Sequence, residues 1–274
     1  MGILDDKVAI ITGSTKGIGK AIAHQFVREG AKVVITSSSY ANVQAALSEF
    51  PPDSVYGHVC NVVSTRDMEQ LIVAATERFG RVDCFINNAG ISDPFRSITE
   101  SDPDEWCNVI DTNLKGTYNG CRAAISYFLK EKRKGKIINM AGSGTDRGSN
   151  TPWISAYGST KAAIARFTFA VAEEYRHTGI SVMLLHPGLV RTGMVSADNP
   201  TPELSRQLAT FSTILDIFAQ SPLVAAQLAV KMASGWSDSK TGIYLSALNG
   251  RRKKMLLLSY PFRKMLNRID RRTY

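Results

Sequence analysis

Short apolar runs recur along the chain, and each is followed by a longer stretch in which apolar residues repeat with a helical period. The runs are rich in Val and Ile and read KVAIIT, KVVIT, SVYGHVC, RVDCFIN, GKIINM, GISVMLLH and TGIYLS. The helical stretches between them cover 17–29, 40–49, 64–79, 102–133, 154–178 and 202–233. Continuously apolar strands that alternate with helices indicate a parallel sheet covered on both faces. The pattern therefore predicts a doubly wound α/β fold.

The pattern continues without a break to about residue 250. A chain of 274 residues, 44% of them hydrophobic, can bury a large core, and it contains no internal repeat or low-complexity linker. We predict one domain over residues 1–250. The stretch 193–203 is rich in Pro, Ser and Asp and predicts a long surface loop inside that domain.

The net charge of +9 is concentrated in a C-terminal extension, residues 251–274. Residues 251–272 contain nine basic side chains and one acidic one, nine minus one, which leaves about +1 for the rest of the chain. The basic residues are Arg251, Arg252, Lys253, Lys254, Arg263, Lys264, Arg268, Arg271 and Arg272. The body of the protein is therefore close to neutral.

The same extension contains a candidate helix. Behind Pro261, the apolar residues Phe262, Met265, Leu266 and Ile269 recur at helical spacing between cations, which predicts a short basic amphipathic helix. Attachment to an anionic membrane surface is one interpretation, because each cation near lipid contributes about 1 kcal/mol. Packing against another subunit, or a solvated extension, is the interpretation we favour. We do not expect nucleic-acid binding, because no recognition fold accompanies the tail.

The four cysteines, Cys60, Cys84, Cys107 and Cys121, show no metal-binding spacing. Four thiols in a chain of this length favour a reducing compartment, and we expect no metal site. No run approaches the roughly 20 apolar residues of a membrane span, and MGILDDKVAI leads directly into a strand without a leader. We therefore expect a cytoplasmic protein.

Two motifs suggest chemistry. TGSTKGIG follows the first apolar run, and Gly13, Gly17 and Gly19 there permit a tight turn and close approach of a pyrophosphate to a helix N-terminus. Tyr157 and Lys161 are four residues apart, on one face of a helix. Activating a phenol with an ordinary pKa near 10 for work near neutral pH takes about 3 units, or roughly 4 kcal/mol. An ammonium about 4 Å away supplies roughly that energy at an effective dielectric constant near 20.

Taken alone, the tyrosine–lysine spacing is unspecific, because Tyr260 and Lys264 repeat it in the tail. The order of five motifs is specific. TGSTKGIG, NNAG, the Asn113 of DTNLKG, SAYGSTKAA and HPGLVRT together resemble the classical type of the short-chain dehydrogenase/reductase family, over residues 5 to about 248. The resemblance implies a Rossmann-type sheet of about seven strands in the order 3-2-1-4-5-6-7, with helices on both faces. It also implies a nicotinamide-dependent enzyme that interconverts a ketone or aldehyde and an alcohol, as a homodimer or homotetramer.

The resemblance assigns roles to individual residues. Tyr157 is expected to be the general acid/base, Lys161 to lower the Tyr157 pKa and bind the ribose, and Asn113 to support a water link to the lysine. Asn87 is expected beside the cofactor as well. The expected cofactor contacts, besides Tyr157 and Lys161, are Gly13, Ser14, Thr15, Lys16, Gly17, Ile18, Gly19, Ser37, Ser38, Ser39, Asn61, Val62, Asn88, Ala89, Gly90, Pro187, Gly188, Val190 and Thr192.

The end of the second apolar run indicates the cofactor. Members that select NAD place a carboxylate there to bind the adenosine ribose, and it would repel a 2′-phosphate. Here Ser37 takes that position, Ser38 and Ser39 follow, and Lys16 adds a cation. We therefore expect NADP(H) rather than NAD(H). Asn61 replaces the usual aspartate near the adenine.

The catalytic serine of such enzymes is displaced. Counting three residues forward from Asn139 gives Gly142, and counting thirteen back from Tyr157 gives Gly144. The loop is thus two residues longer than usual, and we predict that Ser143 faces the tyrosine. Thr145, Ser149 or a water molecule remain alternatives.

The displaced serine leaves a second function open, a cofactor-binding scaffold or sensor with weak catalysis. The intact tyrosine–lysine pair favours the enzyme. The loop and helix at 193–219 are expected to cover the pocket, and they contain no arginine cluster for a phosphate or carboxylate. We therefore expect a small to medium, partly apolar carbonyl or alcohol substrate.

Overall fold

The computed structural model describes residues 2–146, 148, 150–191 and 202–274. Within these ranges the chain forms a seven-stranded parallel sheet in the order β3-β2-β1-β4-β5-β6-β7, which confirms the predicted fold class and strand order. The strands are β1 (Val8–Ile11), β2 (Lys32–Ser37), β3 (Val55–Val59), β4 (Cys84–Asn87), β5 (Gly135–Met140), β6 (Ile180–His186) and β7 (Tyr244–Ser246). The α-helices are α1 (Gly17–Arg28), α2 (Tyr40–Leu47), α3 (Thr65–Phe79), α4 (Pro103–Ile110), α5 (Gly116–Lys130), α6 (Ser155–Glu174), α7 (Pro202–Phe218), α8 (Pro222–Ala233) and α9 (Gly250–Met265).

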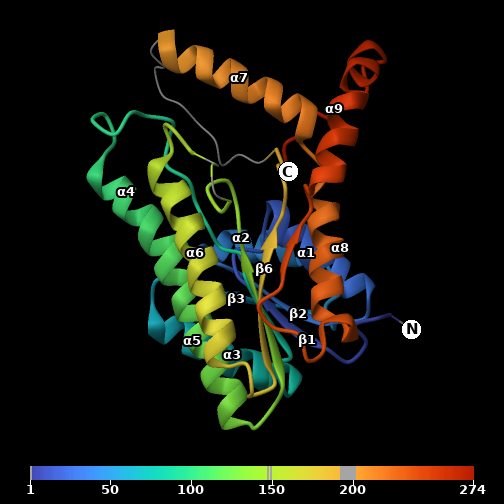
Figure 1. The fold of residues 1–274 in the computed structure, drawn as a ribbon. Coiled ribbons are helices and arrows are strands. Elements are labelled where there is room, and N and C mark those ends of the chain that lie inside the picture. The colour runs from blue at the N-terminus through green and yellow to red at the C-terminus, as the bar shows by residue number, and fades with distance from the viewer. Residues whose placement is uncertain (1, 147, 149, 192–201) are drawn as a thin grey trace.

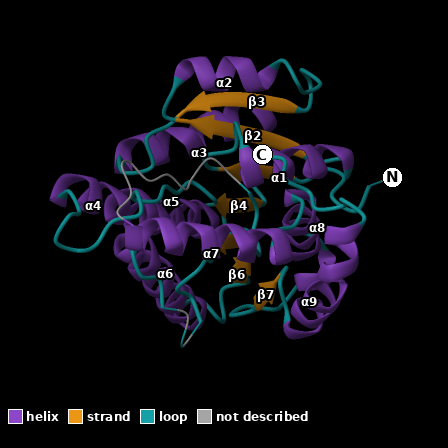
Figure 2. Cartoon of the chain, turned by 90° about the horizontal axis from the view of Figure 1, so that it is seen from above, coloured by secondary structure: helices purple, strands orange, loops and turns teal. Residues whose placement is uncertain are grey.

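Helices cover both faces of the sheet (Figure 2). On one face, buried side chains of α1 and α8, including Phe26 and Val230, pack against the sheet. On the other face, α3, α5 and α6 contribute Leu71, Phe128 and Val171. The central strands are apolar on both sides because each side is covered, and this explains their continuous apolar runs.

The strand order reverses between β1 and β4, where the chain crosses from one half of the sheet to the other. All strands are parallel, so their carboxyl ends lie along one edge. In open sheets of this type, ligands bind outside the carboxyl ends at the point of reversal. The glycine turn, NNAG and HPGLVRT each follow a strand at this edge, SAYGSTKAA opens the helix after β5, and DTNLKG lies between α4 and α5.

Two of the predicted helices are interrupted. The stretch 102–133 contains α4, a five-residue π-helix η1 (Asp111–Lys115) and α5. The stretch 202–233 is divided into α7 and α8, because Pro222 opens α8 and the Ser221 hydroxyl accepts the Leu223 N–H (3.3 Å) as its N-cap. The linker is held in place where the Gln220 N–H donates to the Leu189 carbonyl (2.8 Å).

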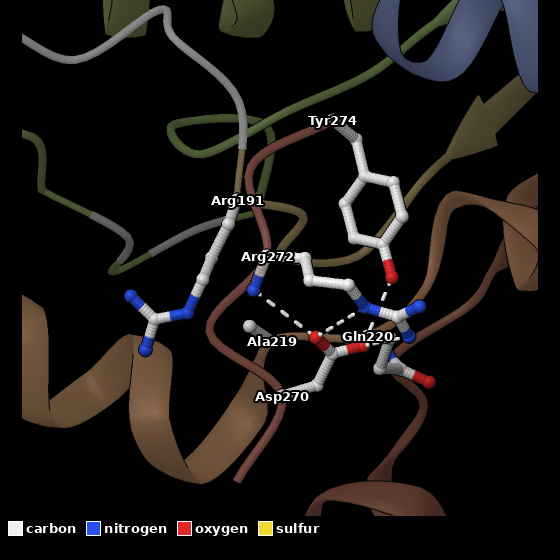
Figure 3. Close-up of a pocket in the computed structure, with 6 residues that line it drawn as sticks. All are labelled: Arg191, Ala219, Gln220, Asp270, Arg272 and Tyr274. Atoms are coloured by element: carbon white, nitrogen blue, oxygen red, sulfur yellow. Dashed lines mark hydrogen bonds and ion pairs between the residues drawn. The ribbon is translucent and has the colours of Figure 1, made fainter.

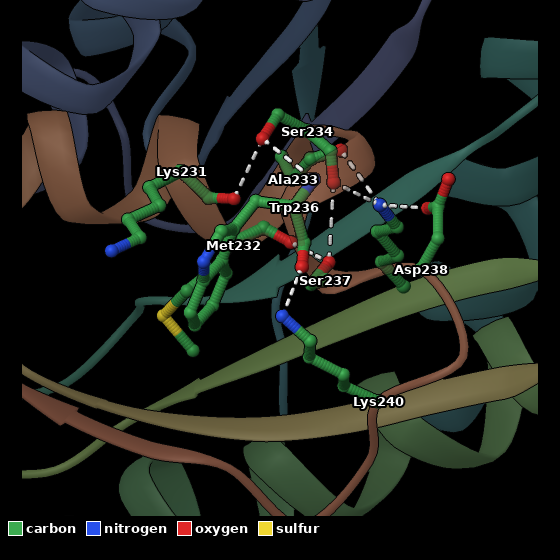
Figure 4. A network of polar contacts seen from close by, with 9 residues as sticks. Lys231, Met232, Ala233, Ser234, Trp236, Ser237, Asp238 and Lys240 are labelled. Carbon is green, nitrogen blue, oxygen red and sulfur yellow. Dashed lines mark hydrogen bonds and ion pairs between the residues drawn. The ribbon is translucent and has the colours of Figure 1, made fainter.

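At the opposite edge of the sheet, the turn after α8 is held by charged side chains (Figure 4). The short 3-10 helix η2 (Gly235–Ser237) presents Trp236 between the ammonium groups of Lys231 (4.3 Å) and Lys240 (4.1 Å). Lys136 pairs with Asp238 (2.7 Å) and donates to the Ala233 carbonyl (3.2 Å). These contacts fix the end of α8 far from the carboxyl edge.

The prediction that the C-terminal helix begins at Pro261 was wrong. Helix α9 begins at Gly250, where the Asn249 side chain accepts the Arg252 N–H (3.0 Å), and Pro261 lies inside it. A proline has no N–H to donate, so Pro261 leaves the carbonyl of Leu257, four residues earlier, without its helical donor. The helix ends at Met265, before Ile269. In the part of the chain described, no helix has both the length and the apolar character to cross a membrane.

Candidate active site

The turn from β1 into α1 depends on glycine. Gly13 and Gly17 have φ values of +60° and +58°, in the left-handed region that side chains disfavour. A Cβ atom on Gly19 would lie 2.4 Å from Asn88 Nδ2 and 2.7 Å from the Gly13 carbonyl oxygen. The turn is therefore pressed against the loop that follows β4, and a side chain at position 19 would separate them.

The N-terminus of α1 fits the pyrophosphate of a dinucleotide. Lys16 is the N-cap residue, its side chain makes no capping hydrogen bond, and the first turn contains no acidic residue. The positive end of the helix, including the amides of Ile18 and Gly19, thus has no capping side chain or carboxylate to compete with an anion. Thr15 is partly buried beside it. Ser14 was expected to contact the cofactor. Its hydroxyl is instead buried and donates to the Ile11 carbonyl (2.6 Å), so it stabilises the turn.

The segments expected at the adenosine follow β2 and β3. The Ser37 hydroxyl accepts the Ser39 N–H (3.2 Å), and Ser39 is the N-cap of α2, while Ser38 is exposed. The Asn61 side chain accepts a backbone N–H in its own loop (3.1 Å). Val62 is only 8% exposed, which leaves little of its side chain for a ligand. Hydroxyls and a helix N-terminus thus meet at the end of β2.

The NNAG loop has two structural asparagines. The buried Asn87 donates to Asn139 Oδ1 (2.8 Å) and to Cys121 Sγ (3.4 Å), so its side chain ties β4 to β5 and packs against α5. Asn88 donates to the carbonyls of Thr12 (2.9 Å) and Gly13 (3.0 Å). The Thr12 hydroxyl accepts the N–H groups of Asn88 and Ala89 (3.0 Å each). Sequence reasoning missed Thr12, although it directly precedes the glycine turn.

The side chains of Asn113 and Lys161 both lie close to Gly90. A Cβ atom there would lie 3.2 Å from Asn113 Oδ1 and 3.8 Å from Lys161 Nζ, so the residue has to be small. The fully buried Asn113 lies in the π-helix η1 and accepts the Ile91 N–H (2.8 Å). Its Nδ2 donates to Thr160 Oγ1 (3.1 Å) on α6. One-turn π-helices often mark functional positions, and this one, between α4 and α5, is hydrogen-bonded through Asn113 to α6 near the lysine.

Tyr157 and Lys161 lie one turn apart on α6, as predicted. The Lys161 ammonium is 5.5 Å from the centre of the Tyr157 ring and donates to the Met140 carbonyl (3.1 Å) at the end of β5. Lys161 is 5% exposed, and burial lowers its pKa to about 8. Burial also raises the pKa of Tyr157 to about 12. In the chain alone, burial thus opposes the lowering of the tyrosine pKa that we expected from the lysine.

An acidic residue that the sequence did not single out caps α6. Asp93 is 8% exposed and follows the NNAG loop. Its carboxylate accepts the N–H of Tyr157 (3.3 Å), and the residue at the N-cap of this helix, Ile154, offers no side-chain cap. Asp93 is visible in the sequence two residues after Ile91. Its partner Tyr157 is 64 residues away along the chain, so no local pattern in the sequence indicated the capping contact.

The residue beside the Tyr157 hydroxyl is Gly142. A Cβ atom there would lie 2.4 Å from Tyr157 Oη, so no side chain fits at this position as the loop stands. Thr145 turns inward, where its hydroxyl accepts the Gly142 N–H (3.1 Å) and lies 3.5 Å from the Lys161 carbonyl. Ser143 is partly buried in the same turn. Ser149 lies outside the described residues.

The loop after β6 contains the residues expected to hold the carboxamide. Gly188 has a φ of +77°, and its N–H donates to Nδ1 of His186 (3.1 Å). Burial lowers the pKa of His186, which also hydrogen-bonds to the Gly142 backbone. Pro187 and Val190 lie in the same loop, whereas Thr192 lies outside the described residues. His186, which was not predicted, thus joins this loop to the one beside Tyr157.

The C-terminal segment packs onto this loop and lines a small pocket with it (Figure 3). The N–H of Tyr274 donates to the Arg191 carbonyl (2.9 Å), and its hydroxyl donates to Asp270 (2.9 Å). Asp216 on α7 pairs with Arg191 and with Arg271 (3.0 Å). The tail thus connects α7 to the loop after β6.

The fold and the site together define a dinucleotide-binding α/β protein with a tyrosine–lysine pair at its topological switch point. Among the residues that the structure describes, no group of three His, Cys, Asp or Glu side chains could hold a metal ion. A polar site of this composition suits proton transfer beside a bound cofactor.

Comparison with known proteins agrees. Residues 7–203 match the family model described as short chain dehydrogenase. The chain is 36% identical over 257 residues to an uncharacterised oxidoreductase of Mycobacterium bovis, covering 91% of this chain and 98% of the relative. A second uncharacterised oxidoreductase, from Staphylococcus aureus, is 37% identical over 202 residues, which are 73% of this chain and 85% of the relative.

Solved structures show the same similarity. A short chain dehydrogenase from Bacillus anthracis superposes with a TM-score of 0.79 at 29% identity, covering 91% of this chain and 97% of the other. A 3-ketoacyl-(acyl-carrier-protein) reductase from Brucella melitensis, complexed with NADH, gives 0.76 at 28% identity, covering 91% and 99%. The chain belongs to the short-chain dehydrogenase family, and with it to the nicotinamide-dependent oxidoreductases that act on alcohol and carbonyl groups.

Proposed function

We propose that the protein is an NADP(H)-dependent oxidoreductase that interconverts a ketone or aldehyde and an alcohol, with Tyr157 as general acid/base. The observation that carries the proposal is the convergence around Gly90, where Asn113 and Lys161 come within 4 Å of one glycine position. Tyr157 lies one turn before the lysine on α6, and the uncapped end of α1 follows the neighbouring strand.

In this proposal Tyr157 gives its proton to the carbonyl oxygen during reduction and removes one from the alcohol during oxidation. Its raised pKa keeps the phenol protonated at neutral pH, which is the form that reduction needs. With its pKa near 8, Lys161 is mostly an ammonium at pH 7. Its charge favours the tyrosinate, and its Nζ can donate to ribose hydroxyls. When bound, the cofactor supplies the hydride chemistry.

The preference for NADP(H) rests on charge at the end of β2. Ser37, Ser38 and Ser39 offer hydroxyls and the start of α2 where a carboxylate would repel a 2′-phosphate. Lys16 is exposed at the N-cap of α1, free to approach an added phosphate. The preference would be contradicted by a higher kcat/KM for NADH than for NADPH.

The experiment is a ketone and aldehyde screen that follows NADPH and NADH oxidation by absorbance, with Tyr157→Phe as the inactive control. We expect turnover with NADPH and a loss of about 10²- to 10⁴-fold in kcat for the variant, the range of a missing general acid. Cofactor affinity should change little, because the variant keeps the ring.

The glycine beside the Tyr157 hydroxyl favours a second candidate, a cofactor-binding scaffold with weak catalysis. No hydroxyl occupies position 142, where the family's serine is expected from Asn139. The same assay distinguishes the two: NADPH binding by calorimetry without turnover of any substrate class would favour the scaffold. We propose that Ser143 supplies the missing hydroxyl in the enzyme.

We further propose a partly apolar substrate and a homo-oligomer. Phe95, after the NNAG loop, and Phe211, on α7, have ring centres 5.6 Å apart, which supports an apolar lining on that side. Tyr118 on α5 and Phe169 on α6 are 50% and 41% exposed on neighbouring helices, which supports subunit contact there. Light scattering of the purified chain would show a monomer if the second inference fails.

A further inference from the structure

Helix α9 has two unlike faces. Its inner face packs on the domain, where Arg263 donates from Nη2 to the carbonyl of Ile217 at the end of α7 (2.7 Å). The Arg263 Nε also donates to Ser259 Oγ (3.3 Å), within the helix. The contact with Ile217 joins this face of α9 to the end of α7.

The outer face is a stripe of large apolar side chains, Met255, Leu258, Phe262 and Met265. They follow one another at intervals of three, four and three residues and so fall on one side of the helix. Their exposed fractions are 57%, 76%, 66% and 74%. In the described part of the chain these side chains stay largely uncovered, so the stripe is a surface that the domain itself does not use.

The charge on α9 is of one sign. The helix contains six cations and no acidic residue. They are Arg251, Arg252, Lys253, Lys254, Arg263 and Lys264. The next acid along the chain, Asp270, is already engaged by Arg272 (2.8 Å) and by the Tyr274 hydroxyl (2.9 Å). An occupant of the apolar stripe therefore also meets a strongly positive field.

In place of the subunit contact or solvated extension favoured from the sequence, we propose that α9 docks on an anionic lipid bilayer surface, with the apolar stripe in the headgroup region and the flanking cations near lipid phosphates. Large apolar side chains beside lysine and arginine, in a helix too polar to span, are the features of an interfacial helix. Pairing with α9 of a second copy fits the charge poorly, because it brings two groups of six cations together. An anionic surface satisfies both the apolar and the charged side chains.

The orientation that follows joins docking to the candidate site. Figure 1 shows α9 beside the end of α7, at the end of the molecule where the carboxyl edge of the sheet lies. Arg263 and the Asp216–Arg271 pair connect the two segments. Docking through α9 thus brings α7 toward the lipid surface. The docking itself does not depend on the proposed reaction.

The test is co-sedimentation of the full-length protein with vesicles of phosphatidylcholine alone or mixed with phosphatidylserine, at low and high salt. We expect binding only to the anionic vesicles, and release by salt. Leu258→Glu and Phe262→Glu should each weaken partitioning about tenfold, a change of about 1.4 kcal/mol. The matched control is Val73→Glu on α3, because Val73 is also an exposed apolar residue (54%) and the variant introduces the same negative charge.

Several outcomes overturn the proposal. If the wild-type chain does not sediment with anionic vesicles at low salt, the proposal is wrong, whatever the variants do. Equal losses for Leu258→Glu and Val73→Glu would show that α9 is not the contact. A concentration-dependent dimer that Leu258→Glu dissociates, without vesicle binding, would assign the stripe to a second copy instead.

Discussion

Burial acts in opposite directions on the two titratable side chains of the candidate site. It raises the pKa of the Tyr157 phenol to about 12 and lowers that of the Lys161 ammonium to about 8. Both shifts favour the neutral forms, because a charge is costly to remove from water. The lysine therefore remains charged at pH 7 at the expense of the folded state. Such a cost is expected where a residue is retained for function rather than stability.

Lys161→Met should therefore stabilise the protein while abolishing turnover. The folded pKa of about 8 lies below the ordinary 10.5, so between these values the unfolded chain binds more protons and stability rises with pH. Below pH 8 the cost is complete, up to about 3 kcal/mol for a shift of this size. Urea unfolding at pH 7 should show a gain of about 1–3 kcal/mol for the variant.

The pH dependence supplies the control for this prediction. Wild-type stability should rise between about pH 8 and 10, and the variant should lack this rise. Above pH 10 the raised pKa of Tyr157 reverses the sign, because the folded state then retains the proton longer. An equal rise in both proteins, or a less stable variant at pH 7, would mean that the ammonium is adequately solvated in the fold.

Ser143→Ala should lower kcat by about 10- to 100-fold with little change in cofactor affinity, if Ser143 supplies the hydroxyl near Tyr157. The size is that of one lost hydrogen bond to a reacting oxygen, about 1.4–2.7 kcal/mol. Thr145→Val is the matched comparison, because it removes the hydroxyl that accepts the Gly142 N–H. Activity that survives Ser143→Ala but not Thr145→Val would assign the role to Thr145.

At the scale of elements, α6 is held by a cap from another segment. The Asp93 carboxylate accepts the N–H of Tyr157 itself, so the cap and the candidate acid share one turn of helix. Helix α4 has a local cap, where Asp102 accepts the N–H groups of Asp104 (2.8 Å) and Glu105 (3.1 Å). The two caps are chemically alike, but only one lies at the site.

This contrast makes a paired prediction. Asp93→Ala and Asp102→Ala should each lower the free energy of unfolding by about 1 kcal/mol, the usual value of an N-cap. Only Asp93→Ala should also lower kcat, because it loosens the turn that positions Tyr157. Thermal melts and steady-state kinetics of both variants provide the test. Equal kcat values would restrict Asp93 to a stabilising role, and Asp93→Asn should recover most of the activity.

The elements that could be predicted from sequence are those with a local cause. Apolar runs and helical periods predicted the α/β class and the alternation, and the family resemblance predicted the strand order. Pro222 is a sequence signal for the start of a new helix. The helical period continues on both sides of it, so the sequence analysis treated 202–233 as one stretch. The start of α9 was missed because Asn249 caps a helix whose first turn is basic rather than apolar.

The site could be predicted only in part, for a similar reason. The glycines, the tyrosine–lysine pair and Asn113 stand in short motifs, so their positions follow from local sequence. Asp93, Thr12 and His186 act through contacts made across the fold, as in the hydrogen bond between Asp93 and Tyr157. The catalytic serine could not be assigned by counting along the loop, because the forward count from Asn139 reaches Gly142, which lies beside the phenol but has no hydroxyl.

At the scale of the whole molecule, the net charge is concentrated at the C-terminal end of the chain. Residues 251–272 contribute a net eight of the nine positive charges, and the domain that contains the candidate site is almost neutral. Attraction of a dinucleotide phosphate to the site therefore depends on a few local groups rather than on the overall field. In the proposed function, the uncapped end of α1 and the serines at the end of β2 are these groups.

Cofactor selection should consequently appear as a difference in stability of the whole protein. A ligand that binds only the folded state stabilises it by about 2.7 kcal/mol at 100 times its Kd, which raises Tm by roughly 5–10 °C for a chain of this size. At equal concentrations NADP⁺ should raise Tm by several degrees more than NAD⁺.

Ser37→Asp should reverse the order, because its carboxylate can bind a ribose hydroxyl and repels a 2′-phosphate. Tyr157→Phe should keep the wild-type order, since it alters the reaction and not the adenosine end. Equal shifts with both cofactors in the wild-type chain would show that the serines and Lys16 do not discriminate a 2′-phosphate.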